Sequence, residues 1–544
     1  MAKWKPLLFY LTLFLLIWAF AATAANYDFD LWARLIAGSG VVDHGQVYKA
    51  DFLSYTPTRM WIDHEYGSGV IFYLFLKFFG PYSLVLLHTM LIFGIFFTAS
   101  KVVKLRLQSP LNPPLQGGLE PYNILFYFLA FIALIPTINS PVRCHLFSFL
   151  LFTVFIYILE LARKGNDKPL YLIPLITIFW NNVHGSVAAG LGLIAMYAAG
   201  EFWTRISCHR SVIEIPDNAV CTPQASTNSR FRDDVAKKYL ITLFVSCLTL
   251  FINPWGWDYI KFLIMANIMH RPDVSEWWGI FSKFHMFKWF QFKLFMVFII
   301  ITMSLRGAFA TKQSSQSAMT IKSWIAALLS VARNDMTKLI VLLVTLYLAI
   351  THLKLIPFFI IASLCYVYED FYALVKPFKE RLIIGLLLGI SVFTLAVKEL
   401  TVPLDFKAYP VQEVEFIKIN NLEGDILTNF GLGSYVSYKL YPHNLIFMDG
   451  RYEEVYHDFM VPLLKKFYLV TPGWDEVLQK FPPDCMIIEK YYPVYNVLKK
   501  SKDWQLVYEG PVFGVFVKPA AKKEYKTPSE DIEYYRKRLF NRYE

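Results

Sequence analysis

The sequence predicts a multi-span α-helical membrane protein that ends in an α/β domain outside the membrane. Hydrophobic residues make up 56% of the 544 residues and the mean hydropathy is positive, which favours a membrane protein over a soluble enzyme. Many apolar stretches approach the roughly 20 residues that a helix needs to cross a bilayer. After residue 398, short alternating segments replace these stretches.

The apolar stretches predict about eleven membrane spans, a count that sequence reasoning fixes to within about two. Each is long enough to cross alone or beside helices that shield it. Two shorter stretches, 68–79 and 255–269, are expected to be interfacial or re-entrant, and 324–331 is expected to form a surface helix. The expected spans are 7–25, 82–100, 121–138, 144–161, 170–182, 186–203, 239–252, 290–305, 338–351, 355–372 and 382–397.

Alternate loops are rich in lysine and arginine, and basic loops are retained in the cytoplasm. The pattern places the N-terminus in the cytoplasm and the first long loop, residues 26–67, outside it. An odd number of spans then places the C-terminal domain outside as well. The expected location is the plasma (inner) membrane. Retained basic loops account for much of the net charge of +11, so we expect no nucleic-acid partner.

The chain divides into a membrane part, residues 1–398, an α/β domain, residues 399–519, and a charged tail, residues 520–544. In the domain, predicted strands alternate with predicted helices, which is typical of a small α/β fold. A glycine turn that opens a helix can cradle phosphate. In "FGLGSY" and "FMDGR" no complete phosphate-binding motif is present, so a turn without a ligand is the favoured interpretation.

The first outer loop carries acids beside apolar and aromatic residues. Asp28 and Asp30 follow the first span directly, and "WIDHEYGSG" places Asp63, His64 and Glu65 between aromatic residues. Aromatic side chains belong at the membrane interface, so these acids are expected there too. A positioned general base accelerates a reaction by roughly 10²–10⁴-fold, and a divalent cation stabilises a departing phosphate. The alternative interpretation is an ordinary solvated loop.

Other polar residues lie in this loop or at the predicted outer ends of later spans. Each has a simpler structural explanation, such as a snorkelling arginine, a polar helix cap or an interfacial anchor. Although scattered in sequence, they are all predicted on one side of the membrane and are expected to converge with the acids on one outward cavity. They are Arg34, Arg143, His184, Arg271, Glu276 and Lys354.

Several motifs occur in order along most of the chain: "DLWARLIAGSGVVDHGQVYKADFLSYT", "WIDHEYGSGVIFYL", "WNNVHG", "NPWGW", "SEW" and "FMDGR". Together they resemble a largely uncharacterised bacterial group within the GT-C superfamily of membrane glycosyltransferases. That group is related to the protein O-mannosyltransferase and aminoarabinose transferase type. The resemblance implies a GT-C-like fold for the membrane part.

The resemblance also implies a reaction, in which a sugar passes from a polyprenyl-phosphate carrier to an extracytoplasmic lipid, glycan or protein acceptor, with inversion. Asp30 matches the catalytic base or metal ligand best, with Asp28 and Glu65 as neighbours. The cofactor stays open; a divalent cation, Mg²⁺ or Mn²⁺, would be held by Asp30, Glu65 or Glu276. Expected substrate-binding residues are Arg34, Asp63, His64, Arg143, His184, Arg271, Glu276 and Lys354.

Two other functions remain open. A transporter or flippase of lipid-linked glycans would use the outer acids as an exit path, but it favours charges deep within spans and repeat symmetry. The sequence indicates few such charges and no repeat. A membrane-anchored glycan-binding module would use the α/β domain as its binding unit, but it leaves the acid-rich first loop without a role.

Overall fold

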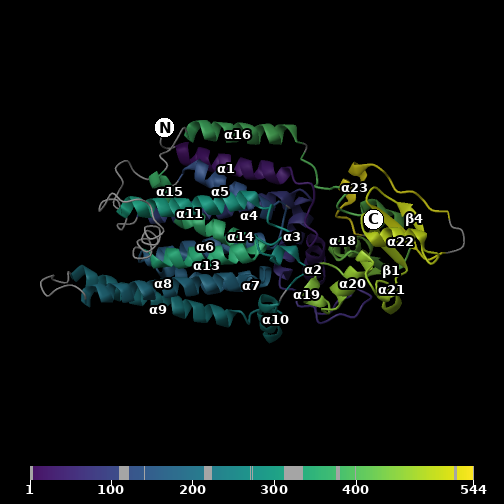
Figure 1. Cartoon of the computed structure of the whole chain (residues 1–544), viewed down its shortest axis with the longest axis horizontal. Coiled ribbons are helices and arrows are strands. Elements are labelled where there is room, and N and C mark those ends of the chain that lie inside the picture. Colours follow the sequence, from purple (N-terminus) through teal and green to yellow (C-terminus); the bar gives the residue numbers. More distant parts are fainter. Residues whose placement is uncertain are drawn as a thin grey trace.

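The computed structural model describes residues 4–108, 122–139, 141–213, 223–269, 271–272, 274–311, 335–374, 380–398, 400–519 and 524–542. The long helices lie roughly side by side, and the α/β domain lies at one end of them (Figure 1). The N-terminus lies at the opposite end (Figure 1). The expected surface helix at 324–331 lies outside the described residues.

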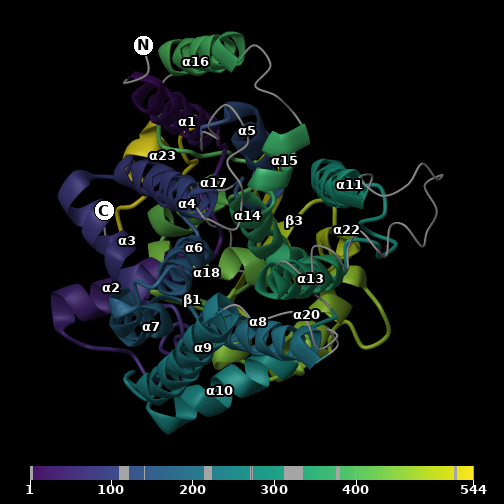
Figure 2. The same cartoon turned by 90° about the vertical axis from the view of Figure 1, so that its left-hand side faces the viewer.

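The described residues of the membrane part form α-helices joined by loops and short 3-10 turns. In Figure 2 the view runs along the bundle, with α1 beside α16 and α8 beside α9. The helices are α1 (Lys5–Ala22), α2 (Leu31–His44), α3 (Tyr66–Phe79), α4 (Ser83–Leu107), α5 (Ile124–Leu134), α6 (His145–Arg163), α7 (Leu172–Val183), α8 (Val187–Ile213), α9 (Pro223–Thr249), α10 (Trp257–Ile268), α11 (Phe290–Thr311), α13 (Met336–Thr351), α14 (Ile356–Tyr366), α15 (Tyr368–Leu374) and α16 (Glu380–Val397).

Among the residues that the structure describes, five helices can cross a membrane by length and composition: α1, α4, α6, the first part of α8, and α16. Five further apolar helices are shorter, so the expected count of eleven spans is not confirmed. One reason is that expected spans are broken: 355–372 divides at Val367 into α14 and α15. The two stretches expected to be interfacial or re-entrant, 68–79 and 255–269, form the short helices α3 and α10.

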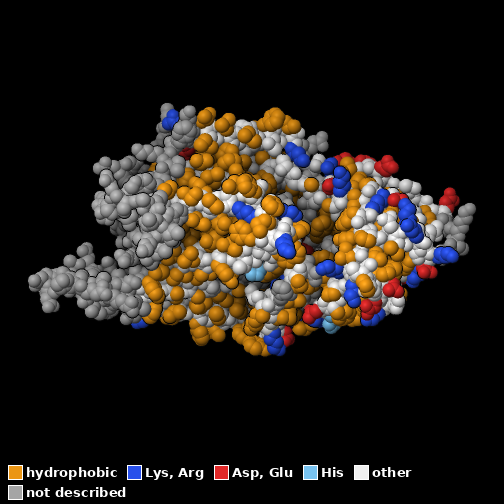
Figure 3. All heavy atoms as spheres, viewed as in Figure 1, with side chains coloured by type: hydrophobic (Ala, Val, Ile, Leu, Met, Phe, Trp, Pro, Cys, Tyr) orange, Lys and Arg blue, Asp and Glu red, His pale blue; other side chains and the backbone are white. Residues whose placement is uncertain are grey.

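On the face seen in Figure 3, the described surface of the helical part is mostly apolar, whereas charged side chains gather on the α/β domain. On α16, Leu386, Ile390 and Phe393 are 57, 58 and 68% exposed. Contiguous exposed apolar surface on this scale marks a binding or membrane surface. Together with the apolar helices, it shows that the helical part belongs in a membrane.

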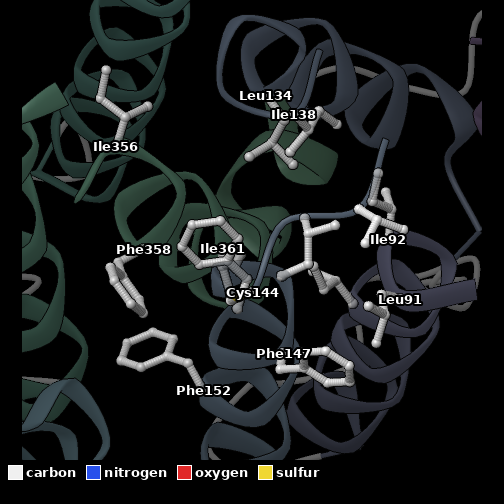
Figure 4. Packing of buried hydrophobic residues seen from close by; sticks show 14 of the residues in the cluster. Leu91, Ile92, Leu134, Ile138, Cys144, Phe147, Phe152, Ile356, Phe358 and Ile361 are labelled. Atoms are coloured by element: carbon white, nitrogen blue, oxygen red, sulfur yellow. The ribbon is translucent and has the colours of Figure 1, made fainter. Parts of the chain in front are cut away.

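The interior between the helices is filled by aromatic and aliphatic side chains (Figure 4). Phe152 of α6 meets Phe358 of α14 edge to face, with ring centroids 4.8 Å apart. Ring pairs prefer this arrangement because the positive edge of one ring meets the negative face of the other. Cys144 and Phe147 extend the same packing toward α4 (Figure 4).

Charged side chains form a buried network at the far end of α6, opposite Arg143. Arg106 lies 3.3 Å from Glu160 and 3.0 Å from Asp335. Arg163 lies 3.0 Å from Glu160 and 3.1 Å from Asp335. The network lies at helix ends, with Arg106 in the last turn of α4, Arg163 at the end of α6 and Asp335 as the N-cap of α13, so it does not bear on the expectation of few charges deep within spans. Because buried charges are tolerated when paired, this network ties α4, α6 and α13 together without indicating a transport path.

One five-stranded sheet forms the core of the C-terminal domain, with the strand order β2-β1-β3-β5-β4. β1 is parallel to β2 and β3, while β5 is antiparallel to β3 and β4. The predicted alternation of strands and helices is confirmed. The elements are α17 (Val411–Ile419), β1 (Gly424–Thr428), α18 (Phe430–Leu440), β2 (Asn444–Ile446), α19 (Tyr452–Val455), α20 (Met460–Leu469), α21 (Glu476–Lys480), β3 (Cys485–Glu489), α22 (Pro493–Lys500), β4 (Gln505–Glu509) and β5 (Phe513–Val517).

The first long loop pairs with β2, the strand at one edge of this sheet. Ser54 forms a parallel bridge with Ile446 of β2. The Ile446 N–H donates to the Leu53 carbonyl at 2.9 Å, and the Tyr55 N–H donates to the Ile446 carbonyl at 3.1 Å. An edge strand leaves backbone groups unpaired unless something covers it. The loop provides that cover and so docks the α/β domain on the membrane part.

The charged tail contains one helix, α23 (Ile532–Arg538), and returns to the rest of the protein. The Tyr438 hydroxyl donates to the Phe540 carbonyl at 2.7 Å. Arg542 Nη1 donates to the Ser39 hydroxyl of α2 at 3.2 Å. The tail therefore strengthens the contact between the domain and the first loop.

Candidate active site

The expected site residues lie where the membrane part meets the α/β domain. In sheets with parallel strands, ligands bind outside the carboxyl ends of the strands. Residues 447–454 follow the carboxyl end of β2, and within them Gly450 lies against Asp30 and Glu454 lies against Arg34. The edge of the sheet at which ligands usually bind therefore faces the acids of the first loop.

Close packing of α2 on α3 brings the two acidic stretches of this loop together. Gly38 of α2 and Gly69 of α3 face each other, and a Cβ on Gly38 would overlap the Gly69 carbonyl. A Cβ on Gly69 would in turn overlap the carbonyl of Arg34. Glycine is the residue that allows such a close approach of two backbones. As a result, the side chain of Arg34 reaches Glu65 just before α3.

The predicted convergence on one cavity is observed for five residues. They line a small hollow of about 20 Å³, which is room for about one water molecule. Leu31, Phe72 and Cys144 are among the apolar residues of its wall. The five residues are Asp28, Asp30, Glu65, Arg143 and Lys354.

Glu276 joins this hollow through Arg143. The Arg143 guanidinium lies 2.9 Å from Asp28 and 3.1 Å from Glu276. Burial opposes ionisation of Glu276, but the charges of Arg143 and Lys354 outweigh it and lower the pKa of Glu276. Three segments distant in sequence are thus joined by one arginine.

Asp30 precedes α2 and caps no backbone N–H with its side chain, so its carboxylate is available to the hollow. Asp30 as a whole residue is exposed to solvent, although protein atoms crowd its carboxylate. This crowding, together with the charge of Asp28, raises the pKa of Asp30 to about 7, against the opposing effect of Arg143. A general base works best with a pKa near the working pH, and Asp30 meets that condition.

Glu65, by contrast, is held in its charged form. His184 Nε2 lies 3.1 Å from one carboxylate oxygen and Arg34 Nε lies 3.4 Å from the other. Burial opposes ionisation, but the charges of Arg34 and His64 outweigh it and hold the pKa of Glu65 well below its usual range. His184 is fixed in turn by the Ser148 hydroxyl, 2.9 Å from Nδ1. Glu65 is therefore better suited to act as a fixed negative charge than as a proton acceptor.

Arg34 is the centre of a buried cluster. Its guanidinium pairs with Asp63 and donates to both carboxylate oxygens of Glu454 at 3.0 Å. Only 3% of Arg34 and 1% of Asp63 is exposed. That these two residues contact a substrate stays a prediction. In this structure Arg34 holds Glu65 and Glu454 in place, and Asp63 accepts a hydrogen bond from the Glu65 N–H at 2.9 Å.

His64, Glu65 and Glu454 could hold a metal ion, because one ligand atom from each lies within 4.8 Å of the others. Among the described residues, the single guanidinium of Arg34 faces three carboxylates, which belong to Asp63, Glu65 and Glu454. Negative charge therefore remains to be balanced. A divalent cation would balance it, and so would protonation of His64. Burial lowers the pKa of His64, but Glu454 and Glu65 outweigh it and raise that pKa. A mixed imidazole and carboxylate set fits Mn²⁺ better than Mg²⁺.

Of the expected metal ligands, only Glu65 belongs to this group of three; in the part of the chain that the structure describes, Asp30 and Glu276 do not. We expect the purified protein to bind Mn²⁺ in equilibrium dialysis, and Glu454→Gln to weaken that binding at least tenfold, since losing even a supporting partner costs about that much. Asp458→Asn, an exposed acid nearby, is the control. Equal Mn²⁺ binding by both variants would exclude a site at Glu454.

Arg271 and Lys354 approach the site around one tryptophan. Arg271 lies over the ring of Trp277 at 4.3 Å and pairs with Glu453 at 2.7 Å. The Lys354 ammonium lies 5.7 Å from the same ring. Arg271 is buried, whereas Lys354 lines the hollow. Lys354 is therefore the better placed of the two to meet a phosphate.

Sequence reasoning missed Glu454 and Gly450. Glu454 completes the cluster of Arg34, and Gly450 contacts Asp30. The signal that points to both is their position just after β2, because the carboxyl ends of parallel strands are where ligands bind. The fold and this site together define a multi-span membrane protein whose α/β domain closes over a polar hollow.

No protein-family model and no curated protein matches the chain. Among solved structures, the arabinofuranosyltransferase AftD from mycobacteria is similar, at 10% sequence identity and a TM-score of 0.47, over 96% of this chain and 40% of that one. A mutant form of AftD is similar at 10% identity and a TM-score of 0.46, over 96% of this chain and 42% of that one. The chain thus spans less than half the length of AftD.

Proposed function

We propose that this protein is a glycosyltransferase that moves a sugar from a polyprenyl-phosphate carrier to an extracytoplasmic acceptor. One observation carries the proposal: acids and cations converge on one hollow where a membrane-embedded bundle meets an α/β domain. The acids suit an acceptor hydroxyl that must lose a proton, and the cations suit a lipid phosphate. A donor with a lipid tail reaches such a site from within the bilayer.

In the proposed reaction, Asp30 accepts the proton of the acceptor hydroxyl. The acceptor oxygen forms a bond to the anomeric carbon, while the bond from that carbon to the phosphate oxygen breaks. The electron pair leaves with the polyprenyl phosphate, whose charge develops near Arg143 and Lys354. A single displacement of this kind inverts the anomeric carbon.

The remaining polar residues support this arrangement. Asp28 fixes Arg143 through the 2.9 Å contact, and its charge keeps the pKa of Asp30 high. Glu65 stays charged beside Arg34 and His184. A divalent cation held by His64, Glu65 and Glu454 would add positive charge for the departing phosphate.

The test is a transfer assay with the full-length protein in lipid nanodiscs. Labelled polyprenyl-phosphate sugars are supplied with a panel of lipid, glycan and peptide acceptors, and transfer of label is measured. We expect time-dependent transfer with at least one pair and an inverted anomeric carbon in the product. Polyprenyl phosphate movement between leaflets without any loss of sugar from the carrier would favour the flippase alternative and contradict the proposal.

A further inference from the structure

The FMDGR segment, residues 447–451, touches the acid that we propose as the base. A Cβ atom built on Gly450 would lie 2.6 Å from Asp30 Oδ1 and 3.8 Å from the hydroxyl of Ser434. A real Cβ needs more room than 2.6 Å, so only a residue without one leaves the carboxylate where it lies. The backbone of the α/β domain at Gly450 is therefore one wall around Asp30.

The residue after Gly450 locks this wall in place. Arg451 donates to Asp449 at 2.9 Å and to Asp51 of the first loop at 2.6 Å. The side chains of Arg451 and Asp51 are 0 and 1% exposed. The guanidinium also lies 4.5 Å from the ring of Trp61, in the same loop. Buried charge-assisted hydrogen bonds of this kind hold a fixed geometry.

We propose that Gly450 is a positioning residue: the α/β domain sets the orientation of the Asp30 carboxylate through the backbone at this position. This inference rests on the proposed function, because it takes Asp30 as the base. Misplacing a reacting group by about 1 Å can cost on the order of 10²-fold in rate. The domain thus forms part of the active site and is more than a cap on it.

The Gly450→Ala variant tests this role cleanly. The added methyl group meets the free end of the Asp30 side chain, which can move aside without unfolding the protein. We expect kcat to fall about 10- to 100-fold, while the donor KM and the melting temperature stay at wild-type values. The control is Gly431→Ala in the same domain, since the nearest atom to a Cβ there is Asn429 Oδ1 at 3.9 Å.

Two results would overturn the positioning role. One is a kcat for Gly450→Ala within twofold of the Gly431→Ala value. The other is a fall in kcat that comes with an equal loss of melting temperature, which would show general damage to the fold.

A cross-linking experiment reports the contact without any activity. In a Cys144→Ala background, which removes the thiol that lines the same hollow, Asp30→Cys is combined with Gly450→Cys. We expect a disulfide on mild oxidation, seen as a shift on non-reducing gels after cleavage between the two positions. The pair Asp30→Cys with Gly431→Cys should not cross-link.

Failure of the cross-link would remove the contact and the inference with it, whatever the transfer assay shows. A cross-link in the double-cysteine variant, found together with no sugar transfer by the wild-type protein, would instead overturn the proposed function and leave the contact established. The two failures are therefore distinguishable.

Discussion

Replacing Asp30 with asparagine is expected to lower kcat by about 10²–10⁴-fold, the range that a positioned general base contributes. The amide has nearly the shape of the carboxylate but accepts no proton from a hydroxyl. The donor KM should change little, because the proposed contacts to the phosphate are at Arg143 and Lys354 and not at Asp30. The measurement is the steady-state transfer assay, with Asp503→Asn, an exposed acid of the α/β domain, as the matched control. Equal kcat values for the two variants would exclude Asp30 as the base.

The pH dependence of the wild-type kcat is a second test of Asp30 as the base. Crowding by protein atoms and the charges of Asp28 and Glu65 raise the pKa of Asp30 to about 7, while Arg143 and Arg34 oppose this. Only the deprotonated form accepts a proton, so kcat should rise as the pH increases through about 7 and level off above it.

The Asp28→Asn variant separates this titration from others. It removes a negative charge that keeps the pKa of Asp30 high, so the rising limb of the pH profile should move to lower pH. A limb that stays in place in this variant would assign the titration to another group.

The sequence predicts the outline of this protein because its strongest signals are local. Apolar stretches identify the helical part, and alternating strand and helix patterns identify the α/β domain. The acids of the first loop stand out because they lie beside the end of α1, and the structure places Asp28 and Asp30 with Glu65 in one hollow. The span count is less accessible, because helices that pack on one another can be short or broken, as α14 and α15 are.

The roles within the site depend on contacts that no local pattern records. Arg34 reads as a loop cation in the sequence, yet it is buried against Glu454, which lies 420 residues further along the chain. That contact exists only because the α/β domain docks on the first loop. Likewise, the sequence indicates only a turn residue at the glycine of FMDGR. Its contact with Asp30 arises from the packing of the α/β domain, which places Gly450 against that residue.

The second large effect is expected from Arg34→Met. This change keeps the length of the side chain but removes the charge that Asp63, Glu65 and Glu454 share. Removing one partner of a buried ion pair costs about 3–5 kcal/mol, because the remaining charges stay buried without compensation. Arg34 belongs to the first loop and Glu454 to the α/β domain. The lost stability should therefore weaken the contact between the first loop and the α/β domain.

The matched control is Arg59→Met. Arg59 also belongs to the first loop and pairs with Asp458 of the α/β domain at 3.1 Å, but the two side chains are 36 and 69% exposed. Exposed pairs contribute about 0–1 kcal/mol. Thermal unfolding in detergent, together with the rate at which a protease releases the α/β domain, measures both variants. If Arg34→Met unfolds and releases the domain no faster than Arg59→Met, then the buried cluster does not hold the domain over the site.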